Sequence, residues 1–289
     1  MHVKRNPSKE GRSLNCVHRR NYFDVVLSFR RQSRVIPPRS FPRFGSLEAE
    51  FVAVMTIPPL HQRARALTDD ELDSVAWLSA LTPAERERAV ASLVVSEARV
   101  GDTICRIGRK ASYWFGLIDG LLKMSNDDSQ GPVITFTGVA PGGWFGEGTV
   151  LKREVYRYNI QALRKSRVAG LPADTFHWLI EHSLGFNRFV MLQLNERLGQ
   201  FIAAREIDRL NDPDLRVARS LSTLVNPILY PNVGEVLRIT QQELAYLVGL
   251  SRQRVNEALS SLQEKGVIKV EYGGLRVLDV AGLRASAPV

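Results

Sequence analysis

A helix, a turn, a second helix and a hairpin can be traced through residues 240–279, and this pattern constrains the fold more than any other stretch. Gly249 can end the first helix, because glycine adopts the left-handed conformation that closes a helix. Ser251 can cap the second helix, which is expected over 252–264 with apolar residues three or four positions apart. Short apolar runs on either side of a glycine pair predict a hairpin over 267–279. Together they predict a winged helix-turn-helix.

The first turns of the second helix are polar, as a helix that enters the DNA major groove requires. Arginine can donate two hydrogen bonds to guanine, and glutamine or asparagine can pair with adenine. Hydroxyl and amide groups at helix N-termini suit backbone phosphates. The alternative is an ordinary helical hairpin with a solvated polar face. The predicted DNA-binding residues are Thr240, Gln241, Ser251, Arg252, Gln253, Arg254 and Asn256.

The region before this motif divides into short helices and a glycine-rich β unit. Thr68 with Glu71 is a capping box that predicts a helix continuing to Leu78, and Thr82 with Glu85 is another. From about residue 94 to 171, short apolar runs are interrupted by glycine every few residues, which predicts an antiparallel roll or barrel.

A long helix is expected from about 187 to 210, after a short helix at 172–183. Apolar residues recur on it every three or four positions, which is typical of a seam for another helix. The seam predicts a parallel helix pair in a homodimer, and packing against the chain's own β unit is an alternative that does not exclude it. The predicted seam residues are Val190, Met191, Leu194, Leu198, Phe201 and Ile202.

The net charge of +9 is unevenly distributed. Residues 1–54 hold eleven Lys and Arg against four Asp and Glu, which leaves a net charge of only +2 on the rest of the chain. We expect residues 1–60 to be a disordered basic tail, with a functional arm as the alternative. A natural start at Met55 would also explain the change in composition.

Composition excludes several classes of protein. No run approaches the ~20 apolar residues of a membrane span, so we expect no membrane segment. Cys16 and Cys105 are the only cysteines, which excludes a disulfide scaffold and an iron–sulfur cluster within one chain. The five histidines show no ligand spacing, so no metal site is expected. No nucleophile–base or carboxylate pair stands out, and we expect no enzyme activity.

The stretch ITQQELAYLVGLSRQRVNEALSSLQEKGVIKV resembles the C-terminal domain of the cyclic-AMP receptor protein/FNR (Crp/Fnr) family of bacterial transcription regulators. The resemblance extends over about 65–285, and GGWFGEG at 142–148 is similar to the family's phosphate cassette. It implies an α+β chain. We expect residues 1–60 to be a basic tail or start-site extension, and residues 61–185 to form a cyclic-nucleotide-binding-type β-roll. A long dimerisation helix should follow at 186–212, and a winged helix-turn-helix at 213–289.

The resemblance also implies an effector site, which we assign to Gly146, Glu147, Arg157 and Tyr158. In the family, the Gly–Glu pair binds ribose, and an arginine at the spacing of Arg157 binds the cyclic phosphate. Tyr158 stands where a small hydroxyl is expected. Residues 201–202 are Phe and Ile where nucleotide-binding members have Thr and Ser. These departures disfavour cyclic AMP. Another small molecule and a roll without a ligand remain open, so the cofactor is unknown.

We therefore expect a cytoplasmic homodimer that binds double-stranded DNA at a two-fold symmetric operator, with RNA polymerase as a further partner. A small effector in the roll would control it. The alternative is a cyclic-nucleotide-binding signalling protein whose C-terminal domain contacts protein. An enzyme that uses the glycine-rich loop is a third interpretation, but the loop lacks the lysine of a nucleotide-hydrolase P-loop.

Overall fold

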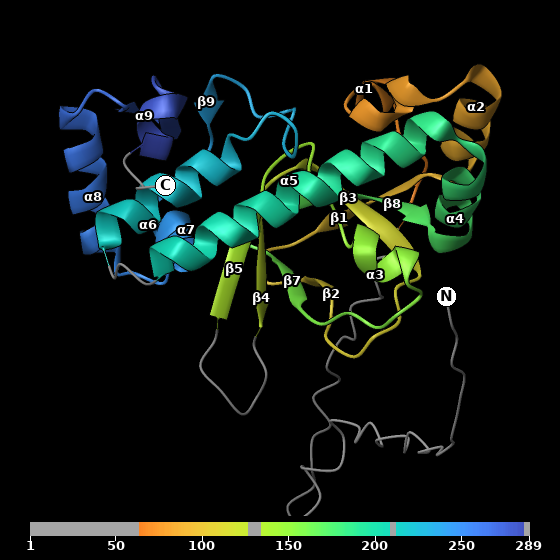
Figure 1. Ribbon diagram of the computed structural model, residues 1–289, viewed down its shortest axis with the longest axis horizontal. Coiled ribbons are helices and arrows are strands. Elements are labelled where there is room, and N and C mark those ends of the chain that lie inside the picture. The colour runs from red at the N-terminus through yellow and green to blue at the C-terminus, as the bar shows by residue number, and fades with distance from the viewer. Residues whose placement is uncertain (1–63, 127–133, 209–211, 286–289) are drawn as a thin grey trace, which may run out of the picture. The chain divides into compact units, whose positions relative to one another are not determined.

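The computed structural model describes residues 64–126, 134–208 and 212–285, with the backbone alone for 206–208 and 285. These residues belong to one compact unit that spans Thr56–Val289 (Figure 1). The predictions for residues 1–60, including Cys16 and the start at Met55, lie outside the described residues.

The glycine-rich region forms a roll of two four-stranded antiparallel sheets, as the sequence predicts. The strand order is β1-β8-β3-β6 in one sheet and β2-β7-β4-β5 in the other. The strands are β1 (Val94–Ala98), β2 (Thr103–Cys105), β3 (Tyr113–Asp119), β4 (Leu122–Asn126), β5 (Ile134–Val139), β6 (Trp144–Phe145), β7 (Asn159–Ala162) and β8 (Ser166–Pro172).

An aromatic core joins the roll to the helices around it. Trp114 of β3 and Trp144 of β6 lie with ring centroids 4.4 Å apart, and Trp77 meets Trp144 edge-on at 5.3 Å. Phe186 from the long helix packs edge-on against Trp77 and Trp114. Gly116 makes this packing possible, because a Cβ there would lie 2.3 Å from the Trp144 ring. The long helix is therefore anchored in the core of the roll.

Capping boxes set the helix starts that the sequence predicts. Both hydrogen bonds of the box are present at Thr68 with Glu71 and at Thr82 with Glu85. The expected first helix is nevertheless wrong in length, because α1 ends at Asp73 and a separate 3-10 turn brings Trp77 into the core. The helices before and around the roll are α1 (Asp69–Asp73), η2 (Ala76–Ala80), α2 (Pro83–Ser92), α3 (Glu147–Leu151) and α4 (Ala173–His182).

The long helix, α5 (Leu184–Asp208), begins three residues earlier than expected. The Ser183 hydroxyl accepts a hydrogen bond from the Phe186 backbone N–H at 3.2 Å, which is the geometry of a helix N-cap. The same serine directly follows the last residue of α4. Ser183 is therefore the single residue between α4 and α5.

The C-terminal region is a helix-turn-helix with a three-stranded sheet, which confirms the predicted winged helix-turn-helix. The hairpin is β10 with β11, and β9 adds a third strand that the sequence pattern does not reveal. Asp212 caps α6 ahead of Pro213. The elements are α6 (Pro213–Leu224), β9 (Val236–Leu237), α7 (Gln241–Val248), α8 (Arg252–Glu264), β10 (Ile268–Glu271), β11 (Gly274–Val277) and α9 (Val280–Ala285).

Glu71 joins the N-terminal helices to the roll through a buried carboxylate. The Arg65 guanidinium donates to both of its oxygens at 2.7 and 2.8 Å, and Arg167 of β8 donates at 3.0 Å. The hydrogen bonds from Arg65 hold the pKa of Glu71 at about 2, below its ordinary 4.5. A depressed pKa stabilises the folded state above the ordinary pKa, and this contribution is lost as the pH falls toward the folded value.

We therefore expect wild-type protein to be more stable than the Glu71→Gln variant by roughly 2–3 kcal/mol near neutral pH. The difference should shrink as the pH falls from about 5 to about 2, because the carboxylate takes up a proton in the unfolded chain at a higher pH than in the folded protein. Urea unfolding of both proteins across this range checks the expectation. A constant difference at every pH would contradict it.

Over the described ranges, none of the helices combines the length and apolar character needed to cross a membrane. The same residues contain no cluster of three or more His, Cys, Asp or Glu side chains suited to a metal ion. Cys105 is free and buried, and burial raises the pKa of its thiol to about 12.

Candidate DNA interface and effector pocket

The turn between α7 and α8 has the conformation that the sequence predicts. Glu243 and Thr240 form both hydrogen bonds of a capping box at the start of α7. Gly249 ends α7 with φ 67°, in the left-handed region. The Ser251 hydroxyl then accepts from the Arg254 backbone N–H at 3.2 Å and caps α8. The local sequence thus fixes the angle at which α8 leaves α7.

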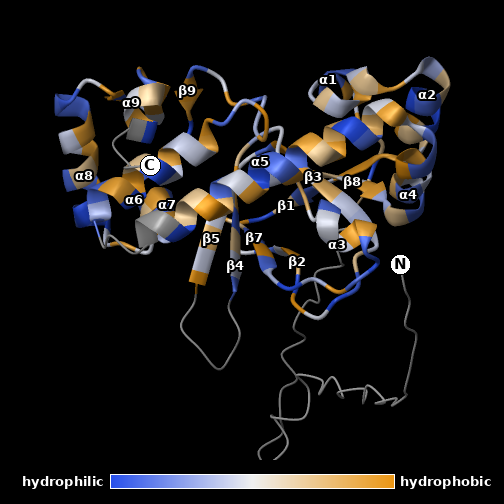
Figure 2. Cartoon of the chain, in the orientation of Figure 1, coloured by the Kyte–Doolittle hydropathy of each residue, from blue (hydrophilic) through white to orange (hydrophobic). Residues whose placement is uncertain are grey.

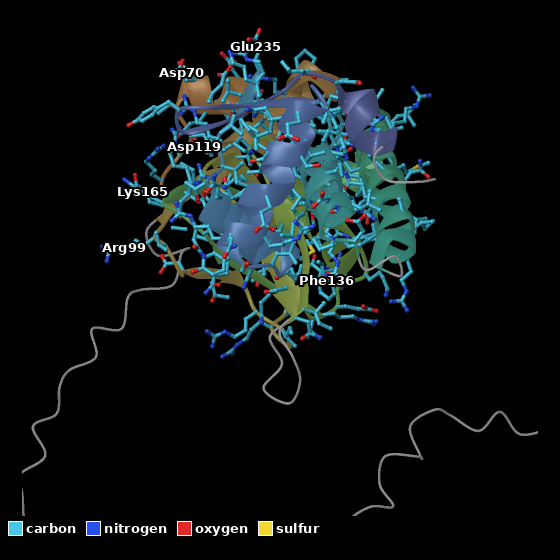
Figure 3. All side chains as sticks on the ribbon, turned by 90° about the vertical axis from the view of Figure 1, so that its left-hand side faces the viewer. Asp70, Arg99, Asp119, Phe136, Lys165 and Glu235 are labelled. Carbon is cyan, nitrogen blue, oxygen red and sulfur yellow. The ribbon has the colours of Figure 1, made fainter. Side chains whose placement is uncertain are left out.

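The exposed face of α8 gathers three of the predicted DNA-binding residues beside α7. Arg252, Gln253 and Asn256 are all exposed. Gln241 of α7 donates to Asn256 Oδ1 at 2.7 Å, and Arg252 Nε lies 3.5 Å from Gln241 Oε1. These amide and guanidinium groups form one connected polar surface over two helices. Figure 3 views the protein from the side that carries α8.

Arg254 does not belong to this surface, although the sequence pattern includes it among the DNA-binding residues. Its guanidinium donates to Asp214 of α6 at 2.8 Å and to Glu257 at 3.0 Å. Arg254 is therefore used to attach α8 to α6. Glu257, which sequence reasoning missed, is exposed one turn after Gln253 and accepts from its side-chain amide at 3.2 Å. The i, i+4 spacing of these two residues could have indicated the pair.

Two faces of α5 differ in burial, and the predicted seam includes residues of both. Val190 is 2% exposed and belongs to the core of its own roll, whereas Met191, Leu198 and Ile202 are 62%, 58% and 58% exposed. Leu194 is half-buried against the same core. Val190 is therefore not available for a seam, because both faces show the same helical period, and the seam stays a prediction for the other five residues.

The exposed stripe of α5 alternates steps of four and three residues, which is the spacing of a coiled-coil seam. Hydrophobic residues along α5 are visible in Figure 2. The side chains of this stripe are all exposed: Leu184, Arg188, Met191, Asn195, Leu198 and Ile202. Asn195 is a polar residue within an otherwise largely apolar series, as occurs where a helix pair must keep one register.

A cavity of 540 Å³ lies between the glycine-rich loop and α5. It contains all four residues of the predicted effector site, Gly146, Glu147, Arg157 and Tyr158. Gly146 has φ 86° and is the N-cap residue of α3, so the loop turns where glycine fits without strain. The structure thus brings the four residues together, and it adds apolar side chains from β4, β5 and α5 that sequence reasoning did not assign to the site.

A buried ion pair forms part of the cavity wall. Arg197 of α5 donates from Nε to Glu147 Oε1 at 2.9 Å and from Nη2 to the Trp144 carbonyl at 2.7 Å. Burial alone would lower the pKa of Arg197, but the Glu147 carboxylate raises it above its ordinary value. Arg197 was not predicted from the sequence, because its partner lies fifty residues away in the chain.

The outer end of the cavity carries three charged residues. Arg157 is 76% exposed and donates to Glu154 Oε2 at 3.2 Å. Lys152 contacts the other oxygen of Glu154 at 2.7 Å. These contacts hold the pKa of Glu154 below its ordinary value, with the Lys152 hydrogen bond as the main cause. The guanidinium that the sequence assigns to a phosphate is thus paired with a carboxylate.

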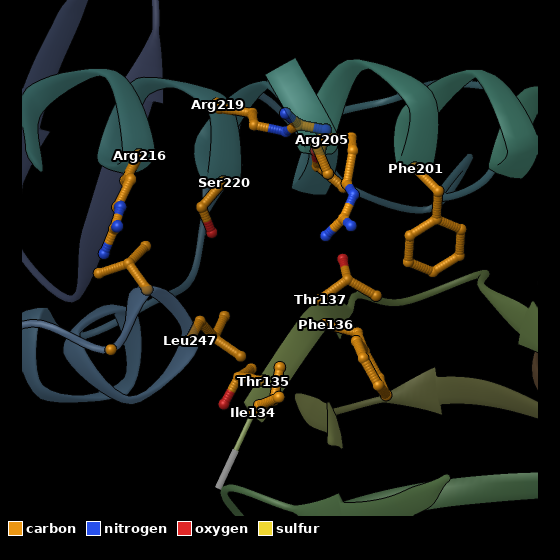
Figure 4. Close-up of a pocket in the computed structure, with 14 residues that line it drawn as sticks. Ile134, Thr135, Phe136, Thr137, Phe201, Arg205, Arg216, Arg219, Ser220 and Leu247 are labelled. Carbon is orange, nitrogen blue, oxygen red and sulfur yellow. The ribbon is translucent and has the colours of Figure 1, made fainter. Parts of the chain in front are cut away.

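A second cavity of 620 Å³ lies between β5, α5, α6 and the α7–α8 turn (Figure 4). Arg205, Arg216 and Arg219 lie on its helical side. Phe136 and Phe201 line this cavity and the first one alike. The pocket of the roll and the space beside the helix-turn-helix therefore share an aromatic wall.

Direct contacts also join the roll to the C-terminal helices. Arg164, between β7 and β8, donates to both oxygens of Glu243 at 2.8 and 2.7 Å. The Tyr230 hydroxyl donates to the Gly138 carbonyl of β5 at 2.9 Å. A Cβ on Gly138 would lie 2.8 Å from a terminal methyl of Leu247, so α7 packs closely on β5 at this glycine.

Two family models match the chain, one to each of these regions. Residues 95–183 match the cyclic nucleotide-binding domain, and residues 215–286 match the Crp-like helix-turn-helix domain. The transcriptional regulator SdrP of Thermus thermophilus is 30% identical over 179 residues, which cover 60% of this chain and 83% of SdrP. The cAMP-activated global transcriptional regulator CRP of Pasteurella multocida is 27% identical over 172 residues, covering 57% and 81%.

The solved structure of FixK2 from Bradyrhizobium japonicum shares the fold at 15% identity. Its TM-score is 0.52, and the alignment covers 68% of this chain and 98% of FixK2. The protein has a β-roll, a long helix and a Crp-like helix-turn-helix, and it is a transcriptional regulator. The chain belongs to the Crp/Fnr family.

The matched domain type implies a cyclic nucleotide, but the residues of the cavity fit one poorly. The Arg157 guanidinium, to which the resemblance assigns the cyclic phosphate, already donates to the Glu154 carboxylate at 3.2 Å. Tyr158 places a bulky phenol where the family has a small hydroxyl side chain. Burial raises the pKa of this phenol, so it stays uncharged. Phe201 offers no hydrogen bond to a base. Polar groups of a base against this ring would be buried without partners, at about 1–3 kcal/mol each.

Proposed function

We propose that this regulator acts as a homodimer that binds a two-fold symmetric DNA operator through the two copies of α8. The observation that carries the proposal is the exposed polar surface of α8 and α7, where Arg252, Gln253 and Asn256 stand beside Gln241. Arginine suits guanine and the amides suit adenine, so the surface offers donors and acceptors for major-groove base edges.

Groups at the starts of α7 and α8 support backbone contacts. Thr240 and Ser251 are exposed caps, and Gln241 is the first residue of α7. Free N–H groups at a helix N-terminus favour anions, so these two ends suit phosphates on either side of the groove. Phosphate contacts fix the position of α8 on the duplex, and base contacts then give sequence preference.

The exposed stripe of α5 supports the homodimer. Met191, Leu198 and Ile202 leave apolar surface uncovered along one side of the helix. A copy of the same helix across a two-fold axis would cover it and set two α8 helices at half-sites of a palindromic operator. RNA polymerase as a partner, a cytoplasmic location beside the DNA and the absence of enzyme activity remain parts of this proposal.

Replacing Arg252 with alanine should weaken operator binding by about 1–3 kcal/mol and relax the preference at one base pair of each half-site. The operator is first selected from a random DNA pool with wild-type protein, and each variant is then titrated against it. Arg254→Ala is the matched control, because this arginine is paired with Asp214 and should leave base preference unchanged.

Binding by wild-type protein should also fall steeply with salt, since each phosphate contact releases counterions. Equal base preferences for wild type and Arg252→Ala would show that another residue makes this contact. No DNA recovered by the wild-type protein would contradict the proposed function itself and favour a C-terminal domain that contacts protein.

A further inference from the structure

The interior of the 540 Å³ cavity is apolar. Met124 of β4, Phe136 of β5 and both Leu194 and Phe201 of α5 contribute side chains to it. Phe136 and Phe201 are 41% and 39% exposed, although both are large aromatic residues. The volume is that of an ordinary small-molecule site, and such sites are lined mainly by hydrophobic side chains. An apolar ligand between the two rings would cover aromatic surface that is otherwise exposed to water.

The polar groups in the wall are already neutralised. The Glu147 carboxylate and the Arg197 guanidinium form an ion pair with a 2.9 Å contact, and both residues are buried. Tyr158 is half-buried and carries no charge. An occupant of the interior therefore meets no unbalanced charge. Glu147 Oε2 and Arg197 Nη1 are buried without a hydrogen-bond partner among the described residues, so the ion pair offers one acceptor and one donor, and further polar groups of an occupant would lose their hydration without compensation.

The outer end of the cavity differs, because its charges do not cancel. Lys152 and Arg157 are two cations that share the single carboxylate of Glu154. Both cations are exposed, and Arg157 uses only Nη2 for Glu154 among the contacts of the described residues. A guanidinium can hold a second carboxylate through its other nitrogens, and one further negative charge would balance this group.

We propose that the cavity binds a monoanionic amphiphile, namely a monocarboxylate with an aliphatic or aromatic body. Its apolar body would lie between Phe136 and Phe201, and its carboxylate would lie at Lys152 and Arg157. The proposal rests on the role of the roll as an effector domain and names the class of effector. It differs from a cyclic nucleotide, whose sugar and base would put polar groups against the apolar wall.

Calorimetry of the full chain with octanoate, octanol and cyclic AMP tests the proposal without DNA. We expect saturable binding of one octanoate per chain. Octanol should bind about tenfold more weakly, because it lacks the charge that Lys152 and Arg157 recognise. Cyclic AMP should bind more weakly than either. Tighter binding of cyclic AMP, or equal affinity for octanoate and octanol, would overturn the proposal.

Variants locate the site. Phe136→Gln should weaken octanoate about tenfold or more, whereas Ile134→Gln should not, although Ile134 lies on the same strand and is similarly exposed. Phe136→Leu keeps an apolar wall and should retain binding, which separates loss of contact from misfolding. Equal loss in Phe136→Gln and Ile134→Gln, or none in either, would place octanoate elsewhere and reject the site.

The charged end is tested by a second matched pair. Arg157→Gln with Lys152→Gln should lower octanoate affinity to that of octanol or below, because Glu154 is then unbalanced, and leave octanol unchanged. Arg109→Gln with Lys110→Gln removes the same two charges outside the cavity and should change neither. If both double variants lose affinity equally, only the net charge of the protein matters. A protein that binds octanoate in this pattern but selects no DNA would refute the proposed function alone.

Discussion

Replacing Arg197 with methionine is expected to destabilise the folded protein by about 3–5 kcal/mol, because Glu147 then remains buried without its partner. The Trp144 carbonyl loses a hydrogen bond at the same time. The free energy of unfolding, measured with urea at a fixed protein concentration, reports the loss. Adding Glu147→Leu to the Arg197→Met variant should recover much of it, since the uncompensated charge is removed.

Arg157→Met is the matched control for this experiment. It breaks the exposed ion pair with Glu154 on the same cavity, and such pairs contribute about 0–1 kcal/mol. The two arginines therefore differ in burial and not in the kind of partner. Similar losses in the two single variants would mean that Glu147 gains water or another donor when Arg197 is removed.

Replacing Leu198 and Ile202 together with glutamate should convert the protein to monomers and weaken operator binding by more than about 100-fold. Each glutamate would carry its charge into a seam of apolar side chains, and the two half-sites would then be bound independently. Sedimentation of the free protein and titration of a two-half-site operator measure the two effects.

Leu198→Met with Ile202→Met keeps the stripe apolar and should preserve both the dimer and operator affinity. Position 194 is unsuitable for this test, because Leu194 lines the cavity of its own roll. A glutamate double variant that still sediments as a dimer would place the interface away from α5.

Local sequence patterns predicted the helix starts and ends that depend on neighbouring residues only. The capping boxes at Thr68, Thr82 and Thr240 each set a helix start, and Gly249 ends α7 in the left-handed conformation. Each depends on residues within one turn of helix, so the sequence contains the whole cause. The order of roll, long helix and winged helix-turn-helix followed from these patterns together with the resemblance.

Features that depend on distant partners could not be predicted in this way. The periodicity of α5 is the same for a residue that packs on its own roll, such as Val190, and for one that faces outward, such as Leu198. Arg254 has the position of a groove-facing arginine, but Asp214 lies forty residues earlier in the chain. The spacing of Arg157 from Gly146 likewise gave no indication that Glu154 would take its guanidinium.

The carboxylate of Glu243 has two tasks at once. It accepts from the Thr240 backbone N–H and hydroxyl, both at 2.8 Å, and from Arg164 of the roll at 2.7 Å. A shorter aspartate would have to give up one of these partners, and glutamine would keep the helix start but lose the charge opposite Arg164. Residue 243 is therefore constrained both by the start of α7 and by Arg164 of the roll, so one side chain links the position of the first helix of the motif to the β-roll.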